Sequence, residues 1–563
     1  MASLIAEYLT RKDIVACISV CREWEALFTP CLWSDMSLRT ILPCHHHDHP
    51  ERPKPSFLFH SQSIRRLTIH RSSSRFSTRE VISTLDECRK IEELILLAPD
   101  SLNDFRPRED TVHSLCHLWI FLITGNINLR RISIGHMFGL PLKRILWSAS
   151  LLPDLEHFKL GCMAIDGIEL HQLFLRPHAD LKSGGKGPIA GPGVHSLQLV
   201  YTHFLGPEAL VGNAEGFYPC LTRLDLTAVS GLDWNQQCTL IGRFPNLVYL
   251  YWLYTNADTH PARHAGTDVV TKVLAQCLRI KSLVFLYAAN IGGEGNANLV
   301  CRMSDKEHVP IIQALPVDLK VLSLALSTFG KFSFRALRAR PFFATTLREL
   351  DMLDCPSFTG VMALDCLESC SGLVKFVAMA IAADELLKRA GNDDKSKPWA
   401  CQKLTYLNAP FRNMFLYRTR PSLEAKKAEQ ERYRNVLRQH MIIFSKLAEL
   451  TWLEHLWLGR PGRPLINEQD NPEVSLDENT EKVDTSKGEL MLTLATGLGA
   501  LASLRRLRSL GLIGLKQKMT MEDAQWMKEN WRILEEIRGK MHPSLAQHRK
   551  LFEVATGATY VSL

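Results

Sequence analysis

A short apolar triplet of the form L-x-x-L-x-L recurs along most of this chain of 563 residues. Its middle residue advances by 26 to 54 positions from one copy to the next, and steps of 26 to 28 are the commonest. A motif of fixed shape and loose spacing indicates stacked repeats with insertions between them. Stacked repeats build a long recognition surface instead of a single pocket. The middle residues are Leu67, Leu94, Ile132, Phe158, Leu197, Leu224, Leu250, Leu283, Leu322, Leu350, Phe376, Leu407, Leu456 and Leu510.

The last two apolar residues of each triplet are two positions apart, so in a strand they point to one face. The residues that flank the middle one then point to the other face. About 18 to 30 residues often separate the copies and can form helical crossovers, which parallel strands need; residues 78–88 read as one such helix. The pattern therefore predicts an α/β solenoid, a horseshoe of about 14 parallel strands. A doubly wound α/β fold is the alternative, but no strand precedes a glycine-rich nucleotide-binding turn.

Composition narrows the classes of function. Apolar residues make up 46% of the chain and charged residues 22%, as in an ordinary soluble globular protein. The net charge of +8 forms no basic block, so we expect no nucleic-acid partner. The 15 cysteines lack the spacing of a disulfide framework, and the sequence shows neither a secretory signal nor a stretch that fits a membrane span. We therefore expect a reduced protein of the cytoplasm and/or the nucleus, with no membrane partner.

Four insertions interrupt the repeats, near 176–193, 388–398, 423–449 and 468–489. The first is rich in Gly and Pro, the second is a charged loop, the third reads as a helix and the fourth is acidic. We divide the chain into a helical hairpin over 1–40, a His/Pro-rich linker over 41–60, the solenoid over 61–530 and a C-terminal cap or tail over 531–563.

The first forty residues carry a helical pattern of their own. Asp13 is a good helix N-cap, Pro30 is expected to end the helix, and Leu32–Trp33 then forms an apolar anchor after the turn. This is too much apolar surface for so short a hairpin, so part of it must dock on the solenoid or on a partner. The residues at helical spacing are Ile14, Cys17, Ile18, Cys21 and Trp24.

Short motifs follow one another in this segment: Tyr8–Leu9, Lys12–Asp13–Ile14, Val20–Cys21–Arg22–Glu23–Trp24 and Leu32–Trp33. In this order and spacing they resemble an F-box, whose elements are L-x-x-x-D-L/I, V-C-[KR]-x-W and L-W. Together with the repeats, nearly the whole chain is similar to the F-box/leucine-rich-repeat subfamily. The family's usual Leu-Pro-x-Glu-Ile opening is missing, so we expect a truncated first helix.

The resemblance implies the substrate-recognition subunit of an SCF-type (Skp–cullin–F-box) ubiquitin ligase. The F-box would bind a Skp-type adaptor and through it a cullin, while the repeats would hold a protein substrate that the sequence does not identify. For Val20 and Trp24 an equally open alternative is that they only hold the hairpin together. By position in the motif, the adaptor contact would fall to Leu9, Ile14, Val20, Cys21, Trp24 and Trp33.

The strand face on either side of each middle residue is the candidate substrate surface. Aromatic side chains mixed with charges suit protein recognition, because they bury a large area at a low cost in side-chain entropy. The alternative is a solvated concave face, partly covered by the C-terminal segment. The candidate residues are Arg131, His157, Arg223, Tyr249, Tyr251, Tyr406 and Trp457.

Motifs for catalysis are weak in this sequence. The run from Cys44 to His49, C-H-H-H-D-H, has suitable metal ligands, but adjacent ligands without a second cluster favour a polar linker. No paired C-x₂-C clusters, G-x-S-x-G elbow or phosphate loop occur. We therefore expect no catalytic residue, metal or cofactor. Two rival hypotheses stay open: a repeat scaffold or inhibitor whose hairpin only caps the solenoid, and a metal-dependent hydrolase that uses residues 44–49.

Overall fold

The computed structural model describes the parts of the chain that are named at the end of this paragraph. They form two compact units, which we call unit 1 (residues 1–265 with 272–280) and unit 2 (266–271 with 281–563). The described residues are 2–6, 8–37, 59–70, 82, 85–97, 109–135, 142–161, 164–166, 170, 173, 193–205, 218–255, 267–288, 304–324, 328–353, 355–390, 398–414, 427–459, 490–555 and 559–560.

Unit 1 opens with three helices, α1 (Ala2–Ala6), α2 (Arg11–Ile18) and α3 (Arg22–Ser34). The sequence had suggested Asp13 as a helix N-cap, but the N-cap of α2 is Thr10. The Asp13 amide donates to Thr10 Oγ1 (3.3 Å), and the Thr10 amide donates to the Asp13 carboxylate (2.9 Å), which is a capping box. The apolar pattern continues through the turn between α2 and α3, so the periodicity alone did not show that the chain forms two helices here.

Pro30 lies inside α3, although the sequence predicted that it would end the helix. A proline in a helix removes one backbone hydrogen bond. The helix nevertheless continues to Ser34, and Trp33 stacks on His60 with ring centroids 5.0 Å apart.

The strands of unit 1 pair in parallel and in chain order. Their register aligns the middle residues of successive triplets, and these residues are at most 1% exposed. The core therefore follows the triplets, as predicted. The strands are β1 (Asp35–Ser37), β2 (Arg66–His70), β3 (Glu93–Leu97), β4 (Arg131–Gly135), β5 (His157–Gly161), β7 (Ser196–Val200), β9 (Arg223–Thr227) and β10 (Tyr249–Thr255).

Unit 2 continues the same construction with parallel strands paired in chain order. All fourteen predicted triplets form strands, which confirms the α/β solenoid. The strands of unit 2 are β11 (Ser282–Ala288), β12 (Val321–Ser323), β13 (Glu349–Met352), β14 (Lys375–Ala378), β16 (Tyr406–Asn408), β18 (His455–Trp457), β19 (Ser509–Gly511), β20 (Glu536–Arg538) and β21 (Thr559–Tyr560).

Three strands of the main parallel ladders were not expected from the sequence: β1, β20 and β21. Strand β20 belongs to a triplet of Leu534, Ile537 and Gly539, and its third residue is a glycine with a φ of 110° in place of an apolar side chain. The parallel pairing therefore runs past residue 530, where the sequence placed the end of the solenoid.

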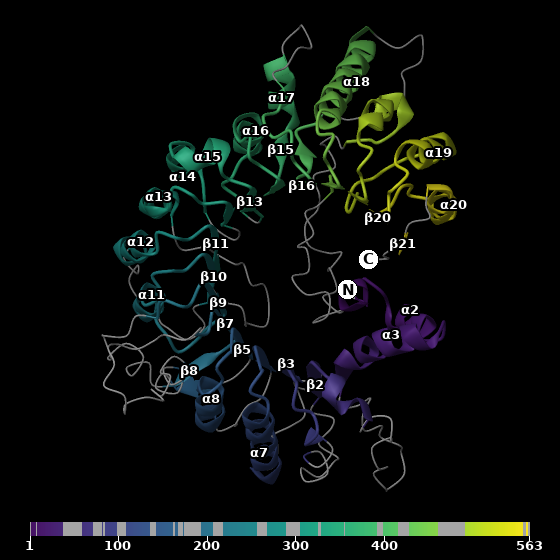
Figure 1. Cartoon of the computed structure of the whole chain (residues 1–563). Coiled ribbons are helices and arrows are strands. Elements are labelled where there is room, and N and C mark those ends of the chain that lie inside the picture. The colour runs from purple at the N-terminus through teal and green to yellow at the C-terminus, as the bar shows by residue number, and fades with distance from the viewer. Residues whose placement is uncertain are drawn as a thin grey trace. The chain divides into compact units, whose positions relative to one another are not determined.

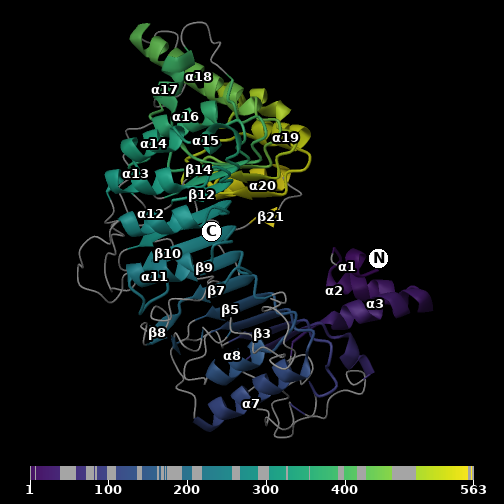
Figure 2. The same cartoon turned by 60° about the vertical axis from the view of Figure 1, so that its left-hand side comes forward.

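Within each unit the repeat helices lie on one side of the strands (Figures 1 and 2). The helix α12 (Thr267–Gln276) contributes residues to both units. In unit 1 the other repeat helices are α7 (Glu109–Gly125), α8 (Leu142–Ser150) and α11 (Trp234–Gly242). In unit 2 they are α13 (Asp305–Ala314), α14 (Lys331–Arg338), α15 (Pro341–Thr345), α16 (Gly360–Ser369), α17 (Ala383–Ala390), α18 (Lys427–Ala448), α19 (Met521–Asn530) and α20 (Leu545–Ala555).

The predicted insertions have different outcomes. The helical insertion near 423–449 contains α18, as expected. The charged loop near 388–398 starts later than predicted, because Lys388 to Ala390 still belong to α17. The insertions near 176–193 and 468–489, the linker over 41–60 and the helix expected over 78–88 lie wholly or mostly outside the described residues.

Two short parallel strand pairs accompany the main ladders and were not predicted. In unit 1, β6 (Ala164–Asp166) pairs with β8 (His203–Leu205), and Ile165 and Phe204 are buried there. In unit 2, β15 (Ile381–Ala382) pairs with β17 (Phe411–Arg412). These pairs add backbone hydrogen bonds between consecutive repeats.

Candidate functional site

The N-terminal hairpin leaves many of its large apolar side chains in solvent. Ile14 is 7% exposed and Phe28 5%, whereas Val20 is 64% and Trp24 is 42% exposed. Trp24 and Leu27 are three residues apart in α3 and therefore lie on neighbouring positions of the helix surface. We call the following residues the exposed apolar set of the hairpin: Leu4, Ile5, Tyr8, Val15, Val20, Trp24 and Leu27.

The residues predicted to contact an adaptor have different surroundings. Ile14 is buried and so helps to hold the hairpin together, while Leu9 is half-buried. Val20 and Cys21, at the turn between α2 and α3, are exposed. The ring of Trp24 lies 5.6 Å from that of Phe28, yet much of it faces solvent. Val20 therefore contributes little to holding the hairpin, and Trp24 both packs and faces outward.

Trp33 has a different position from the other five, at the junction between the hairpin and the repeats. Trp33 stacks on His60, and the residues that follow it join the parallel sheet of unit 1. The Arg65 amide donates to the Ser34 carbonyl (2.9 Å), and β1 pairs with β2 from Asp35 onward. The hairpin is thus tied to the first edge of the sheet in unit 1.

The strand face of unit 1 brings four predicted substrate residues into one row. Strand register places Arg131 beside His157, and Arg223 beside Tyr249, with Ser196 between His157 and Arg223. Tyr251 lies in the next row, beside Asp225. Tyr406 and Trp457 are on the corresponding face of unit 2. The alternation within each triplet predicted this common face correctly within each unit.

The charges of the row in unit 1 act on each other. Partial burial lowers the pKa of His157 below 6.5, and the neighbouring charge of Arg131 lowers it further, while Glu156 acts in the opposite direction. Burial raises the pKa of Asp225, against a hydrogen bond from Thr227 Oγ1 of 2.6 Å. The face therefore disfavours an additional positive charge at His157.

The aromatic side chains on the strand faces are already engaged with their neighbours. The guanidinium of Arg223 lies over the ring of Tyr249, 4.4 Å from its centroid. The ring of Tyr406 has the Lys375 ammonium 5.5 Å from its centroid. These neighbours are on adjacent strands, so they could be found only once the register was known.

Trp457 lies along the sheet of unit 2. A Cβ atom on Gly511, its partner across the strands, would overlap the indole, and the Arg538 guanidinium is 5.1 Å from the ring centroid. Sequence reasoning missed Arg538, because the strand that carries it was not predicted.

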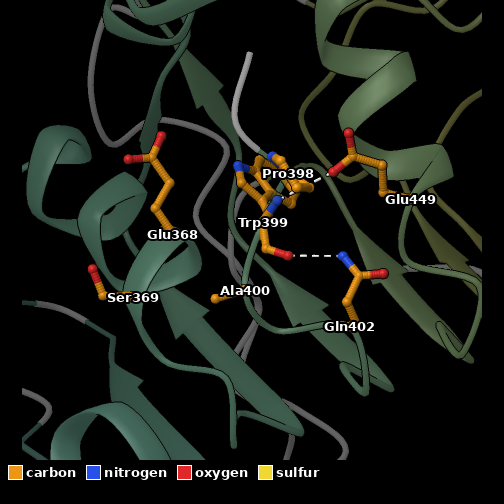
Figure 3. Close-up of a pocket in the computed structure, with 7 residues that line it drawn as sticks. All are labelled: Glu368, Ser369, Pro398, Trp399, Ala400, Gln402 and Glu449. Carbon is orange, nitrogen blue, oxygen red and sulfur yellow. Dashed lines mark hydrogen bonds between the residues drawn. The ribbon is translucent and has the colours of Figure 1, made fainter. Parts of the chain in front are cut away.

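Unit 2 has a cavity of about 750 Å³ near the C-terminal end of α16 (Figure 3). Figure 3 shows Trp399 between Glu368 and Glu449, and the Trp399 amide donates to Glu449 (3.2 Å). Both carboxylates already have cationic partners: Arg389 is 2.7 Å from Glu368, and Lys446 is 2.9 Å from Glu449. This arrangement is typical of structural ion pairs, not of carboxylates poised for acid–base chemistry.

Metal and thiol sites do not stand out in the part of the chain that the structure describes. No group of three or more His, Cys, Asp or Glu side chains there could hold a metal ion, and the predicted candidate at 44–49 lies outside it. The described cysteines are free, and burial raises the pKa of the Cys88 and Cys238 thiols to about 12. None of the described helices combines the length and the apolarity that a bilayer crossing requires.

No protein-family profile and no curated protein sequence matches this chain. Similar solved structures include a chain of the TLR13–ssRNA13 complex, with 14% identity, a TM-score of 0.33, and coverage of 86% of this chain and 62% of that one. A chain of the Rad7–Elc1 complex from yeast has 12% identity and a TM-score of 0.31, covering 61% and 74% respectively. The leucine-rich-repeat protein LegL7 from Legionella pneumophila has 11% identity and a TM-score of 0.27, covering 69% and 94%.

The chain thus spans 62% of the TLR13 chain to which it is similar. Its own geometry defines the architecture: buried leucine triplets in register on successive parallel strands, with helices on one side. The chain therefore has the architecture of an α/β solenoid built from leucine-rich repeats.

Proposed function

We propose that this protein is the substrate-recognition subunit of a Skp–cullin–F-box ubiquitin ligase. The hairpin binds a Skp-type adaptor, and through it a cullin, while the strand face of the repeats binds a protein substrate. In this proposal the chain itself is not catalytic, needs no cofactor and acts in the cytoplasm and/or the nucleus. The observation that carries the proposal is the exposed apolar set of the hairpin, together with the F-box-like order of its motifs.

The energetics favour a partner for this surface. Burying one large apolar side chain stabilises a structure by about 1.5–3 kcal/mol. Seven such side chains are exposed within the first 27 residues, although the hairpin is anchored just after them through Trp33 and β1. Exposed apolar groups at this density are typical of protein interaction sites.

The test is capture of a purified Skp-type adaptor by the full-length protein. Because Val20 is 64% exposed, Val20→Asp should leave the hairpin folded and reduce capture at least about tenfold, since it puts a charge into an apolar interface. Val317→Asp is the matched control, because Val317 is 59% exposed in unit 2 and should capture as the wild type does. No capture by the wild-type protein, or equal capture by both variants, rejects the proposal.

A second candidate function is supported by the anchoring of the hairpin. The pairing of β1 with β2 extends the ladder, and α3 contacts η1 (Ser61–Ser63) at the start of the repeats. A hairpin that only caps the solenoid of a scaffold or inhibitor protein would need these contacts and nothing more. This alternative leaves the exposed apolar set without a role.

A further inference from the structure

Three cations on the strand face of unit 1 form no ion pair with any residue that the structure describes. Within the described residues, no acidic group lies within ion-pair distance of Arg131, Lys159 or Arg223. Arg131 and Arg223 are exposed, and Lys159 is half-buried. Lys159 lies two residues after His157 on β5, so both side chains are on the same face.

Comparable positions elsewhere are neutralised. On β2, Arg66 is 3.6 Å from both Asp35 and Glu93, the residues beside it on the neighbouring strands. In unit 2, Lys375 is 3.9 Å from Glu349 on the adjacent strand. The unpaired cations are therefore a local property of strands β4, β5 and β9, not a general property of this solenoid.

Two carboxylates near these strands do not cancel the charge. Asp225 accepts a hydrogen bond from Thr227 (2.6 Å), and the charges of Arg223 and Lys159 act on its carboxylate, but neither cation lies within ion-pair distance of it. Glu156 lies just before β5, and its carboxylate is 3.8 Å from His157 Nε2. The Glu156 amide donates to the Arg130 carbonyl, and the His195 amide donates to the Glu156 carbonyl.

The spacing of the cations suits an extended peptide with several acidic side chains. From β4 to β9 there are three strand steps, about 14 Å in all, which an extended chain covers in about four residues. Arg131, Lys159 and Arg223 come from three different strands, so single carboxylates spread along a peptide match them better than one phosphate group. Guanidinium groups also bind carboxylates in a bidentate manner.

A nucleic acid fits this surface less well. On one side the basic region ends at β3, where the acidic residue Glu93 lies beside Arg131. On the other side it ends at Tyr249, and the Arg223 guanidinium lies over the ring of this tyrosine. Single-stranded nucleic acids are held by a longer basic groove with open aromatic rings on which the bases stack. The basic stretch on the described strands of unit 1 is shorter than such a groove.

We propose that the face formed by β4, β5 and β9, with Arg131, Lys159 and Arg223, binds an acidic peptide segment of the protein substrate. That the bound peptide belongs to a substrate rests on the proposed function. It assigns the substrate class as a protein that presents an extended run of Asp or Glu side chains. Binding then gives each of the three cations an ion-pair partner, which none of the described residues provides.

The test is fluorescence anisotropy of labelled peptides with the full-length protein. The probe is a short Gly/Ser peptide with Glu at every second position, and the comparison peptide has Gln at the same positions. We expect the Glu peptide to bind at least about tenfold more tightly, and added salt to weaken it, because exposed charges are screened. Equal affinities for the two peptides would overturn the proposal.

The variants make the test specific to this face. The double substitution Arg131→Gln with Arg223→Gln should weaken the Glu peptide about 5- to 30-fold, since each exposed charge pair contributes up to about 1 kcal/mol. The matched control, Arg66→Gln with Lys375→Gln, removes two cations that already have partners and should stay within about twofold of the wild type. Wild-type affinity in the first double variant would exclude this face.

Two further probes decide the class of ligand. A Gly/Ser peptide with a single phosphoserine and a short single-stranded RNA should both bind more weakly than the Glu peptide. Tighter binding of either one, lost in the Arg131/Arg223 double variant, would overturn the assignment to an acidic peptide.

The ligase role is tested separately by adaptor capture. The Arg131/Arg223 double variant should capture the adaptor normally, and Val20→Asp should bind the Glu peptide normally. Loss of the ligase role alone would leave peptide binding intact, whereas failure of this inference would leave adaptor capture intact.

Discussion

Gly511 shows how one residue makes room for an aromatic side chain on the strand face. It lies on β19 directly beside Trp457, and any Cβ atom at this position would overlap the indole ring. The Arg538 guanidinium on the next strand is 5.1 Å from the same ring. The indole is therefore held along the sheet by the residues of two neighbouring repeats.

We predict that Gly511→Ala lowers the free energy of unfolding by about 1–3 kcal/mol, the usual cost of overpacking. Chemical denaturation followed by tryptophan fluorescence measures this. Gly499→Ala is the control, because the nearest atom to a Cβ there is 4.0 Å away, and it should unfold as the wild type does. Equal midpoints for the two variants would show that the indole moves aside at little cost.

At the scale of elements, one carboxylate connects two consecutive repeat helices of unit 2. Asp305, at the start of α13, accepts hydrogen bonds from the backbone amides of Gly330 (2.8 Å), Phe332 (2.8 Å) and Ser333 (3.0 Å) at the start of α14. Ser333 Oγ donates in return to the Asp305 carbonyl (2.7 Å). The side chain of one helix thus satisfies the free amide groups of the next.

We predict that Asp305→Ala destabilises unit 2 by about 1–2 kcal/mol at neutral pH, as the loss of a helix cap does. Burial alone would raise the pKa of Asp305, but the hydrogen bonds from Ser333, Phe332 and Gly330 outweigh it and lower the pKa below 3.8. The contribution of a carboxyl group with a lowered pKa is complete above its ordinary pKa and is lost as the pH falls through the folded-state value.

The difference in the free energy of unfolding between the wild type and Asp305→Ala should therefore stay constant down to about pH 4 and then shrink at lower pH. Urea denaturation over a pH series measures it. Asp318→Ala provides the control, since Asp318 is exposed and lies in the turn after α13. A gap that widens on acidification would contradict the assigned direction of the pKa shift.

The sequence predicted the repeat strands well and their partners poorly. Each triplet has the two-residue period of a strand and recurs often enough to identify the solenoid. The strand β20 was missed because Gly539 replaces the third apolar residue, and with it the partner of Trp457 was missed. The unpaired state of Arg131 depends on strand register and on the reach of carboxylates from neighbouring strands, neither of which a repeat pattern contains.

At the scale of the whole molecule, the hairpin has two parts with separable roles. Trp33 and β1 attach it to the first repeat of unit 1, whereas Val20, Trp24 and Leu27 remain exposed. A hairpin that serves only as a cap needs the first part, and an adaptor-binding hairpin needs both. Substitutions in the two parts therefore separate the two candidate functions.

We predict that Trp33→Ala lowers the free energy of unfolding by about 1–3 kcal/mol, because it removes the ring stacked on His60 at this junction. Trp24→Ala should cost less stability, since its ring is 42% exposed, but should weaken adaptor capture more. Thermal unfolding and adaptor capture, measured on both variants of the full-length protein, give four values. If Trp24→Ala lowers stability as much as Trp33→Ala does and leaves capture unchanged, Trp24 only holds the hairpin together and does not contact the adaptor.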